Sequence, residues 1–170
     1  MTGEENDTDE TNASGLPPHS IELVVYGGLD EEIAKAIHRR KGAGIQTYGN
    51  VTVPVVDAAG NIKNISFSRP APVNVWVKVF NLQTDSTFPL DGIEQIKQRL
   101  TEYIGSDTRG GLNIGQNVIC VALPTEVFKV QGVVDFDLQI SPDGETYSWK
   151  NITIAAREKA VTNEEMVVVE

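Results

Sequence analysis

The sequence predicts an α+β fold made of two small mixed subdomains, each combining helices with antiparallel or mixed sheets. Several short segments alternate polar and apolar residues, as half-buried strands do, whereas only two stretches repeat apolar residues with a clear helical period. The elements follow one another as β-α-β-β-β and then α-(α)-β-β, unlike the regular alternation of a doubly wound parallel sheet. The chain has 170 residues, of which 40% are hydrophobic, and can bury the cores of such subdomains.

The predicted boundaries give a flexible lead and two folded parts. Residues 1–18 are acidic and polar without apolar periodicity, which is typical of a loosely attached segment. The first α+β subdomain is expected over residues 19–82 and the second over residues 83–170.

The first subdomain is expected to begin with a strand and a helix. Residues 20–26 form an apolar run that two glycines stop, which predicts a strand. Asp30 is the expected N-cap of a helix that begins with acidic residues, ends with basic ones and stops before Gly42.

A hairpin and a long strand follow. Residues 50–56 and 61–67 alternate on either side of a turn, and Pro54 indicates an edge position for the first of these strands. Residues 73–82 form the longest alternating run, which predicts a strand that is central or covered on both faces. One face of this run carries Val73, Val75, Val77 and Val79, and the other carries Trp76 and Phe80.

The second subdomain is expected to begin with a helix from Asp91 to Gly105. Glu94, three residues after Asp91, forms a variant of the capping box. The glycine-rich residues 105–116 predict a loop, and residues 118–131 are expected to be extended before Pro124 and helical after it.

Extended segments complete this subdomain. Residues 133–140 predict a strand, residues 151–155 a short extended piece and residues 166–169 a final strand. Asp135 and Asp137 lie on one face of the first strand, and the alternation turns Val134, Phe136 and Leu138 towards the core. A solvated face is therefore favoured over a catalytic pair of carboxylates.

The charge distribution excludes two classes of partner. The formal charge is 14 − 24 = −10, and no Lys or Arg precedes Lys35. Binding to nucleic acid, or tethering to an anionic membrane, requires clustered basic residues. We therefore expect neither a nucleic acid nor a membrane partner.

No motif in the sequence indicates catalysis, a cofactor or a metal. His19 and His38 lack metal-ligand spacing, and His38 is expected to be a solvated helix residue. Cys120 lies in an apolar stretch, where a small buried hydrophobe is the expected role, and a single cysteine cannot form an intrachain disulfide. We expect no enzymatic activity, no cofactor and no small-molecule substrate.

One basic cluster stands out against this acidic background. It consists of Lys35, Arg39, Arg40 and Lys41, and it lies at the end of the first predicted helix. One interpretation is a solvated helix end, in which Glu31 pairs with Lys35 one turn later. The other is a docking point for an acidic partner.

The first part of the chain carries, in order, Gly15-Leu16-Pro17-Pro18-His19-Ser20, Gly27-Gly28, Asp30, Ile33, Ala34, Ile37, Gly42, Gly44, Gly49 and Phe67-Ser68-Arg69-Pro70. The second part carries the stretch FPLDGIEQIKQRLTEYI and the turn Val130-Gln131-Gly132-Val133. In this ordered succession the chain, from about residue 6 onwards, resembles the C-terminal half of the baseplate J-like family, whose members are wedge proteins of Mu-like contractile phage tails. Family members are generally longer, which implies a missing N-terminal half.

The resemblance implies a structural role with no catalytic residues. The expected partners are other baseplate wedge and hub proteins and neighbouring copies of the chain. The expected location is the virion tail baseplate of a phage, a prophage or a tailocin, after synthesis in the bacterial host cytoplasm. The alternatives are a non-catalytic module that binds carbohydrate or a cell surface, and a tail-associated hydrolase.

Overall fold

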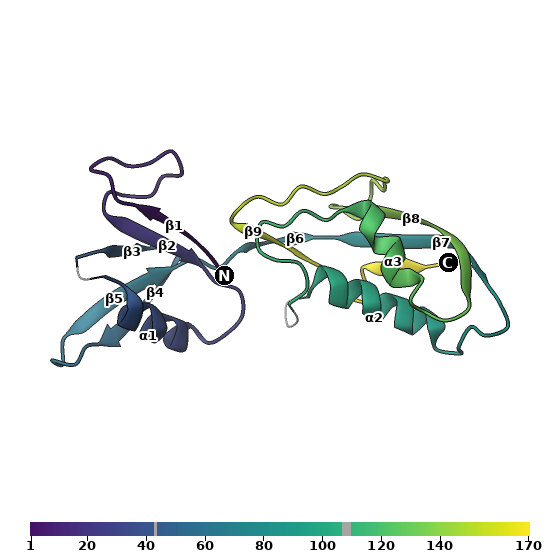
Figure 1. Ribbon diagram of the computed structural model, residues 1–170, viewed down its shortest axis with the longest axis horizontal. Helices are drawn as coiled ribbons and strands as arrows, with labels where there is room; N and C mark the ends of the chain where they lie inside the picture. Colours follow the sequence, from purple (N-terminus) through teal and green to yellow (C-terminus); the bar gives the residue numbers. More distant parts are fainter. Residues whose placement is uncertain (43, 107–109) are drawn as a thin grey trace. The chain divides into compact units, whose positions relative to one another are not determined.

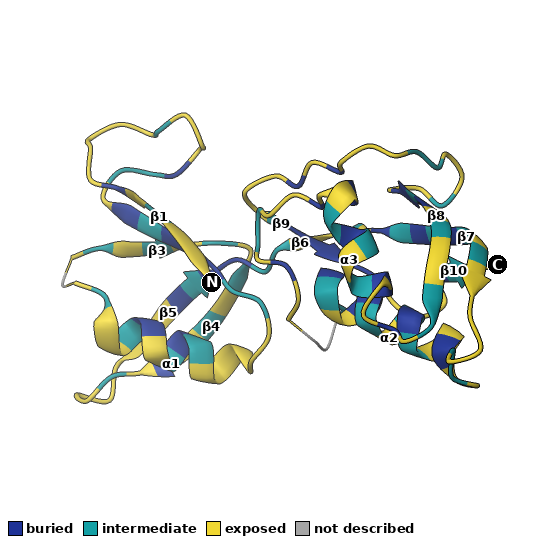
Figure 2. Cartoon of the chain, turned by 45° about the vertical axis from the view of Figure 1, so that its right-hand side comes forward, coloured by how far each residue is buried: buried dark blue, intermediate teal, exposed yellow. Residues whose placement is uncertain are grey.

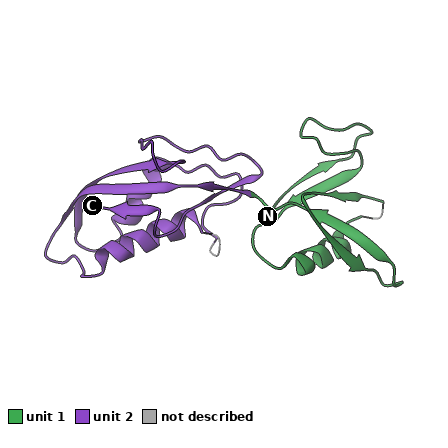
Figure 3. Ribbon diagram, turned by 180° about the vertical axis from the view of Figure 1, so that it is seen from behind, with its two compact units in different colours: residues 1–70 green, residues 71–170 purple. Residues whose placement is uncertain are grey.

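The computed structural model describes residues 1–42, 44–106 and 110–170 and has the α+β fold that the sequence predicts. The chain divides into two compact units, Met1–Pro70 and Ala71–Glu170 (Figure 3). The predicted division after residue 82 is therefore wrong. The run that was expected to close the first subdomain pairs only with strands of the second unit, so its backbone hydrogen bonds place it there.

Unit 1 contains two small sheets and one helix (Figure 1). The first sheet has the order β1-β2-β3, with β1 antiparallel and β3 parallel to β2. The second is the predicted hairpin of β4 and β5, in which Pro54 lies opposite Asn64 in a two-stranded sheet and therefore on an edge. The elements are β1 (Thr2–Asn6), β2 (Ser20–Val24), α1 (Asp30–Arg40), β3 (Gln46–Tyr48), β4 (Val51–Val56) and β5 (Ile62–Phe67).

The core of unit 1 forms between α1 and the hairpin. Ala34 and Ile37 face inward from α1 and pack with Ile65 and Phe67, whereas the opposite face of the helix is exposed (Figure 2). Asp30 is the first helical residue and not the predicted N-cap, which is Leu29. The carboxylate of Asp30 is instead bound by Arg69.

The acidic lead is part of unit 1, so the prediction of a loosely attached segment is wrong. Thr2–Asn6 pairs along β2, and Leu16 is fully buried. The buried Asn6 amide donates to the carbonyls of Glu10 and Leu16, both at 2.8 Å, and thereby holds the intervening loop. The segment lacks apolar periodicity because backbone pairing and one side-chain amide, not an apolar face, attach it.

Unit 2 is built around a long central strand (Figure 1). β7 lies between parallel β10 and antiparallel β8, which confirms its predicted central position, and β6 before it pairs with β9 in parallel. The strands are β6 (Ala71–Asn74), β7 (Trp76–Thr84), β8 (Val133–Ser141), β9 (Glu158–Val161) and β10 (Val167–Val169). The helices are α2 (Gly92–Ile104), the 3₁₀ turn η1 (Cys120–Ala122) and α3 (Leu123–Val127).

The core of unit 2 lies between this sheet and the helices. Val75, Val77 and Val79 are fully buried, as the alternation predicts, whereas Trp76 and Phe80 on the other face remain half-buried. The buried side of α2, formed by Ile96, Leu100 and Ile104, packs on the valine face (Figure 2).

Three local predictions in unit 2 are wrong. Asp91 is the N-cap of α2 but makes no side-chain capping bond, because its carboxylate accepts from Gln95 instead. Helical structure begins before Pro124, since a proline in the first helical turn needs no N–H donor. Val134 was expected to face the core, but its side chain is 56% exposed near the irregular end of the β7–β8 pairing.

The predicted loop at residues 105–116 is present as far as the structure describes it, and residues 107–109 lie outside the described residues. Over the described ranges, no helix has the length and apolar character needed to cross a membrane.

Candidate functional site

The predicted docking residues lie at the C-terminal end of α1, where two of the four already make local contacts. Lys35 Nζ pairs with Glu32 Oε1 at 3.1 Å, not with the predicted Glu31. Lys41 Nζ donates to the carbonyl of Ile45 at 2.9 Å. The side chains of Arg39 and Arg40 are exposed. Of the four basic residues, Arg39 and Arg40 are therefore the ones whose charge is not held by a contact with a described residue.

A pocket lined by aromatic rings, here called the aromatic pocket, lies along β8 in unit 2 and has a volume of about 400 Å³. Three elements supply its walls: β7, the segment that begins with α3, and β8, with a contribution from the loop that follows β8. Its lining consists of Phe80, Pro124, Phe128, Asp135, Phe136, Asp137, Leu138, Gln139 and Trp149.

The rings of the aromatic pocket are held in place yet open to solvent. Phe128 packs against Phe136 with ring centroids 4.8 Å apart and an interplanar angle of 51°. Phe128 is 53% exposed and Trp149 is 50% exposed, so much of both rings faces water. Clustered exposed aromatic area is uncommon on a protein that works alone and is typical of binding surfaces.

Two carboxylates border these rings. Asp135 and Asp137 are exposed, as predicted, but they line the aromatic pocket and do not lie on a featureless solvated face. Asp135 Oδ1 accepts from the backbone N–H of Phe136 at 2.9 Å, and Asp137 Oδ2 accepts from the Asn81 amide at 2.8 Å. One oxygen of each carboxylate is thus fixed by a local donor.

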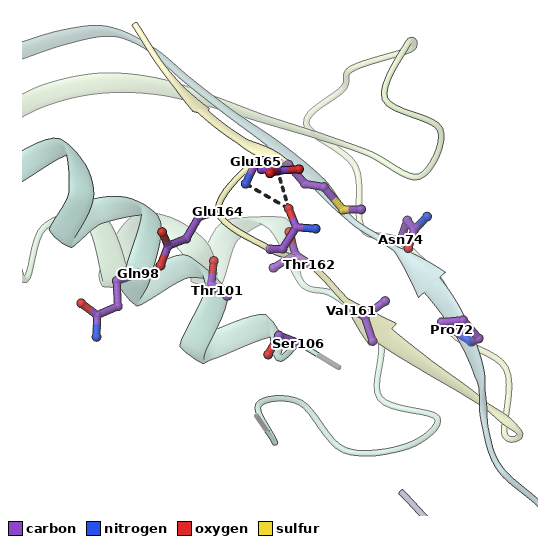
Figure 4. A pocket seen from close by; sticks show the side chains of 11 residues that line it. Pro72, Asn74, Gln98, Thr101, Ser106, Val161, Thr162, Glu164 and Glu165 are labelled. Atoms are coloured by element: carbon purple, nitrogen blue, oxygen red, sulfur yellow. Dashed lines mark hydrogen bonds between the residues drawn. The ribbon is translucent and has the colours of Figure 1, made fainter. Parts of the chain in front are cut away.

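A second pocket, here called the polar pocket, lies beside α2 and β9 and has a volume of about 660 Å³ (Figure 4). Thr101 and Thr162 are only 8% and 3% exposed, and their hydroxyls have no hydrogen-bond partner among the described residues. Gly105 joins the two backbones, because it donates to the Thr101 carbonyl and accepts from the Thr162 N–H, each at 2.8 Å. The lining includes Pro72, Asn74, Gln98, Val161, Asn163, Glu164, Glu165 and Met166.

The nucleophilic and metal-binding residues do not converge on either pocket. Cys120 is 1% exposed, which confirms the expected buried position, and burial raises the pKa of its thiol to about 11. His19 contacts Asp9 at 2.9 Å. His38 is half-buried with an unpartnered Nδ1, so the expectation of a solvated residue is wrong. Among the described residues, no group of three potential metal ligands is found.

Sequence reasoning did not find the aromatic pocket. Aromatic residues make up only 6% of the chain, but four of the eight in unit 2 line this one pocket. Trp149 reaches the pocket because Ser148 pairs with Ile140 at the end of β8. No protein-family model matches this chain, and no curated protein sequence matches it.

Proposed function

We propose that the chain is a structural component of a contractile-tail baseplate wedge and acts through protein–protein contacts. The observation that supports this role is the aromatic pocket, in which Phe128 and Trp149 each keep about half of their surface exposed. Aromatic anchors of this kind contribute a large share of the binding energy at protein interfaces. The resemblance to the baseplate J-like family supplies the proposed setting.

Some of the residues that carry this resemblance also contact one another in unit 1. The Arg69 guanidinium donates to the carbonyls of Gly27 and Gly28 at 2.7 and 2.8 Å, and to Asp30 at 2.6 Å. Gly27 and Gly28 adopt φ values of 70° and 76°, which glycine reaches without strain. The ordered succession of these residues therefore has a structural reason in unit 1.

The proposal includes a location and partners. The chain would reside in the virion tail baseplate of a phage, a prophage or a tailocin, in contact with other wedge and hub proteins and with neighbouring copies. Its proposed role is non-catalytic and requires no cofactor.

A carbohydrate-binding module is the second candidate, because carboxylates beside exposed rings also suit sugars. Rings stack on the apolar faces of a sugar, and carboxylates accept from its hydroxyl groups. Screening of the intact chain on a glycan array separates the two candidates. Specific binding of one sugar class would favour this second role.

The experiment that tests the first proposal is deletion of the gene, followed by electron microscopy of the particles. Absent or incomplete baseplates are expected, and normal infectious particles would contradict the proposal. Complementation with Phe128→Ala/Trp149→Ala should fail to restore baseplates. The matched control is Tyr48→Ala, which removes a 42% exposed ring from unit 1 and should restore them.

A further inference from the structure

We infer that the aromatic pocket binds an arginine side chain presented by a partner protein. The inference rests on the proposed protein-contact role of this pocket and specifies the chemistry of the partner. It combines the exposed rings with the two carboxylates that border them.

The carboxylates are positioned to receive N–H donors. Asp135 and Asp137 lie two residues apart on β8, so their side chains leave the same side of the strand. The Phe136 N–H occupies Oδ1 of Asp135, and the Asn81 amide occupies Oδ2 of Asp137. The second oxygen of each group can accept from a fork of two donors, which a guanidinium provides and an ammonium does not.

The aromatic rings of the pocket are also suited to bind a guanidinium. A guanidinium is planar and weakly hydrated, and it stacks on aromatic faces while its edge donates to carboxylates. Phe128 and Trp149, both about half exposed, line the pocket together with both acids. One arginine can therefore stack on a ring and pair with a carboxylate, and its charge adds an attraction that an uncharged side chain lacks.

The charges of unit 2 favour a cationic occupant. Residues 71–170 hold 8 basic and 14 acidic residues, and 8 − 14 = −6. Neither Asp135 nor Asp137 forms an ion pair with a described residue. The nearby Lys129 ammonium is held by Glu126 at 2.7 Å. No described cation of this chain pairs with the two carboxylates, so they would attract a basic partner.

Titration of the intact chain with Nα-acetyl-arginine amide tests the inference, with NMR observation of the indole N–H signals. The chain has only two tryptophans, and Trp76, which lies under Gly144, serves as the internal reference. We expect a saturable shift of the Trp149 signal that weakens as salt is raised. The citrulline amide has nearly the same shape without the charge and should produce no saturable shift.

Asp135→Asn/Asp137→Asn is the matched variant, since it keeps the size but removes both charges and replaces one acceptor oxygen of each group with an NH2 donor. It should weaken arginine amide binding by roughly tenfold or more. Equal responses to arginine and citrulline, or a response to N-acetylglucosamine and none to arginine, would overturn the inference. Those outcomes leave the baseplate role intact, whereas normal baseplates after gene deletion would contradict that role whatever the titration shows.

Discussion

Arg69 holds together the loop that connects β2 to α1. Its guanidinium donates to Val25, Gly27 and Gly28 carbonyls at 2.7 to 3.0 Å and pairs with Asp30. Truncation leaves these acceptors without their charged donor, so Arg69→Ala should lower the free energy of unfolding by about 2 kcal/mol. Urea denaturation measures this loss.

Arg69→Lys is the control, because it keeps the positive charge but lacks the planar guanidinium. An ammonium cannot reach all of these acceptors, so this variant should fall between wild type and Arg69→Ala. If Arg69→Ala unfolds at the wild-type urea concentration, the guanidinium does not hold the loop.

Asp143 makes the loop after β8 sensitive to acid. The Ser141 hydroxyl and the N–H groups of Thr146 and Glu145 bind its carboxylate and lower its pKa from 3.8 to about 2. Because the pKa is lower in the folded state, the ionised group stabilises the fold above about pH 3.8, and this contribution is lost as pH falls through about 2. An NMR titration of the Gly144 amide should have its midpoint near 2. A midpoint near 4 would show that these bonds do not form.

Thr101 and Thr162 bury hydroxyls that pair with no group in the part of the chain that the structure describes. Valine has the same shape without the hydroxyl, so Thr101→Val and Thr162→Val should each raise the free energy of unfolding by roughly 1 kcal/mol. Thr125→Val, at an exposed position of α3, is the control and should change it little. Destabilisation by both buried substitutions would show that the hydroxyls make hydrogen bonds in solution.

β1 and the acidic loop after it depend on Asn6. The amide of this buried residue donates to Glu10 and Leu16, and its Oδ1 accepts from Thr8 at 2.7 Å. Asn6→Ala should release the loop, so a glutamate-specific protease should cleave after Glu10 several times faster than in wild type. Asn64→Ala changes an exposed asparagine of β5 and should leave the rate unchanged. Equal rates in all three proteins would mean that Asn6 does not anchor the loop.

The elements that could be predicted from sequence are those whose apolar pattern is local. The β4–β5 hairpin, α1, α2 and the valine face of β7 all have such a pattern. β1 is almost entirely polar, and β3 has three residues, so both form by backbone pairing to β2 without a signal of their own.

The candidate site could be predicted only in part for a related reason. The alternation of β8 correctly indicates that Asp135 and Asp137 are exposed. The neighbouring rings of Phe128 and Trp149 come from segments on either side of β8 in sequence. Only the packing of Phe128 on Phe136 and the pairing of Ser148 with Ile140 gather them at one pocket. The sequence pattern of these segments does not indicate that the two rings line the same pocket.

When the chain is divided after Pro70, both units carry a net negative charge. Residues 1–70 carry 6 − 10 = −4 and residues 71–170 carry 8 − 14 = −6, so the larger share of the net charge of −10 lies in unit 2. The more acidic unit is also the one that contains the aromatic pocket. We therefore expect the partner of this protein to present basic residues to unit 2.

Photo-cross-linking in assembled particles tests the proposed contact. Phe128 is replaced by p-benzoylphenylalanine, and the control carries the same group in place of Tyr48. Irradiation of purified particles should join the Phe128 position to another baseplate protein, whereas the control position should give no adduct of that kind. Mass spectrometry identifies the joined protein. Particles that contain no copy of this chain, or that yield no adduct from the Phe128 position, would contradict a structural role exerted through the aromatic pocket.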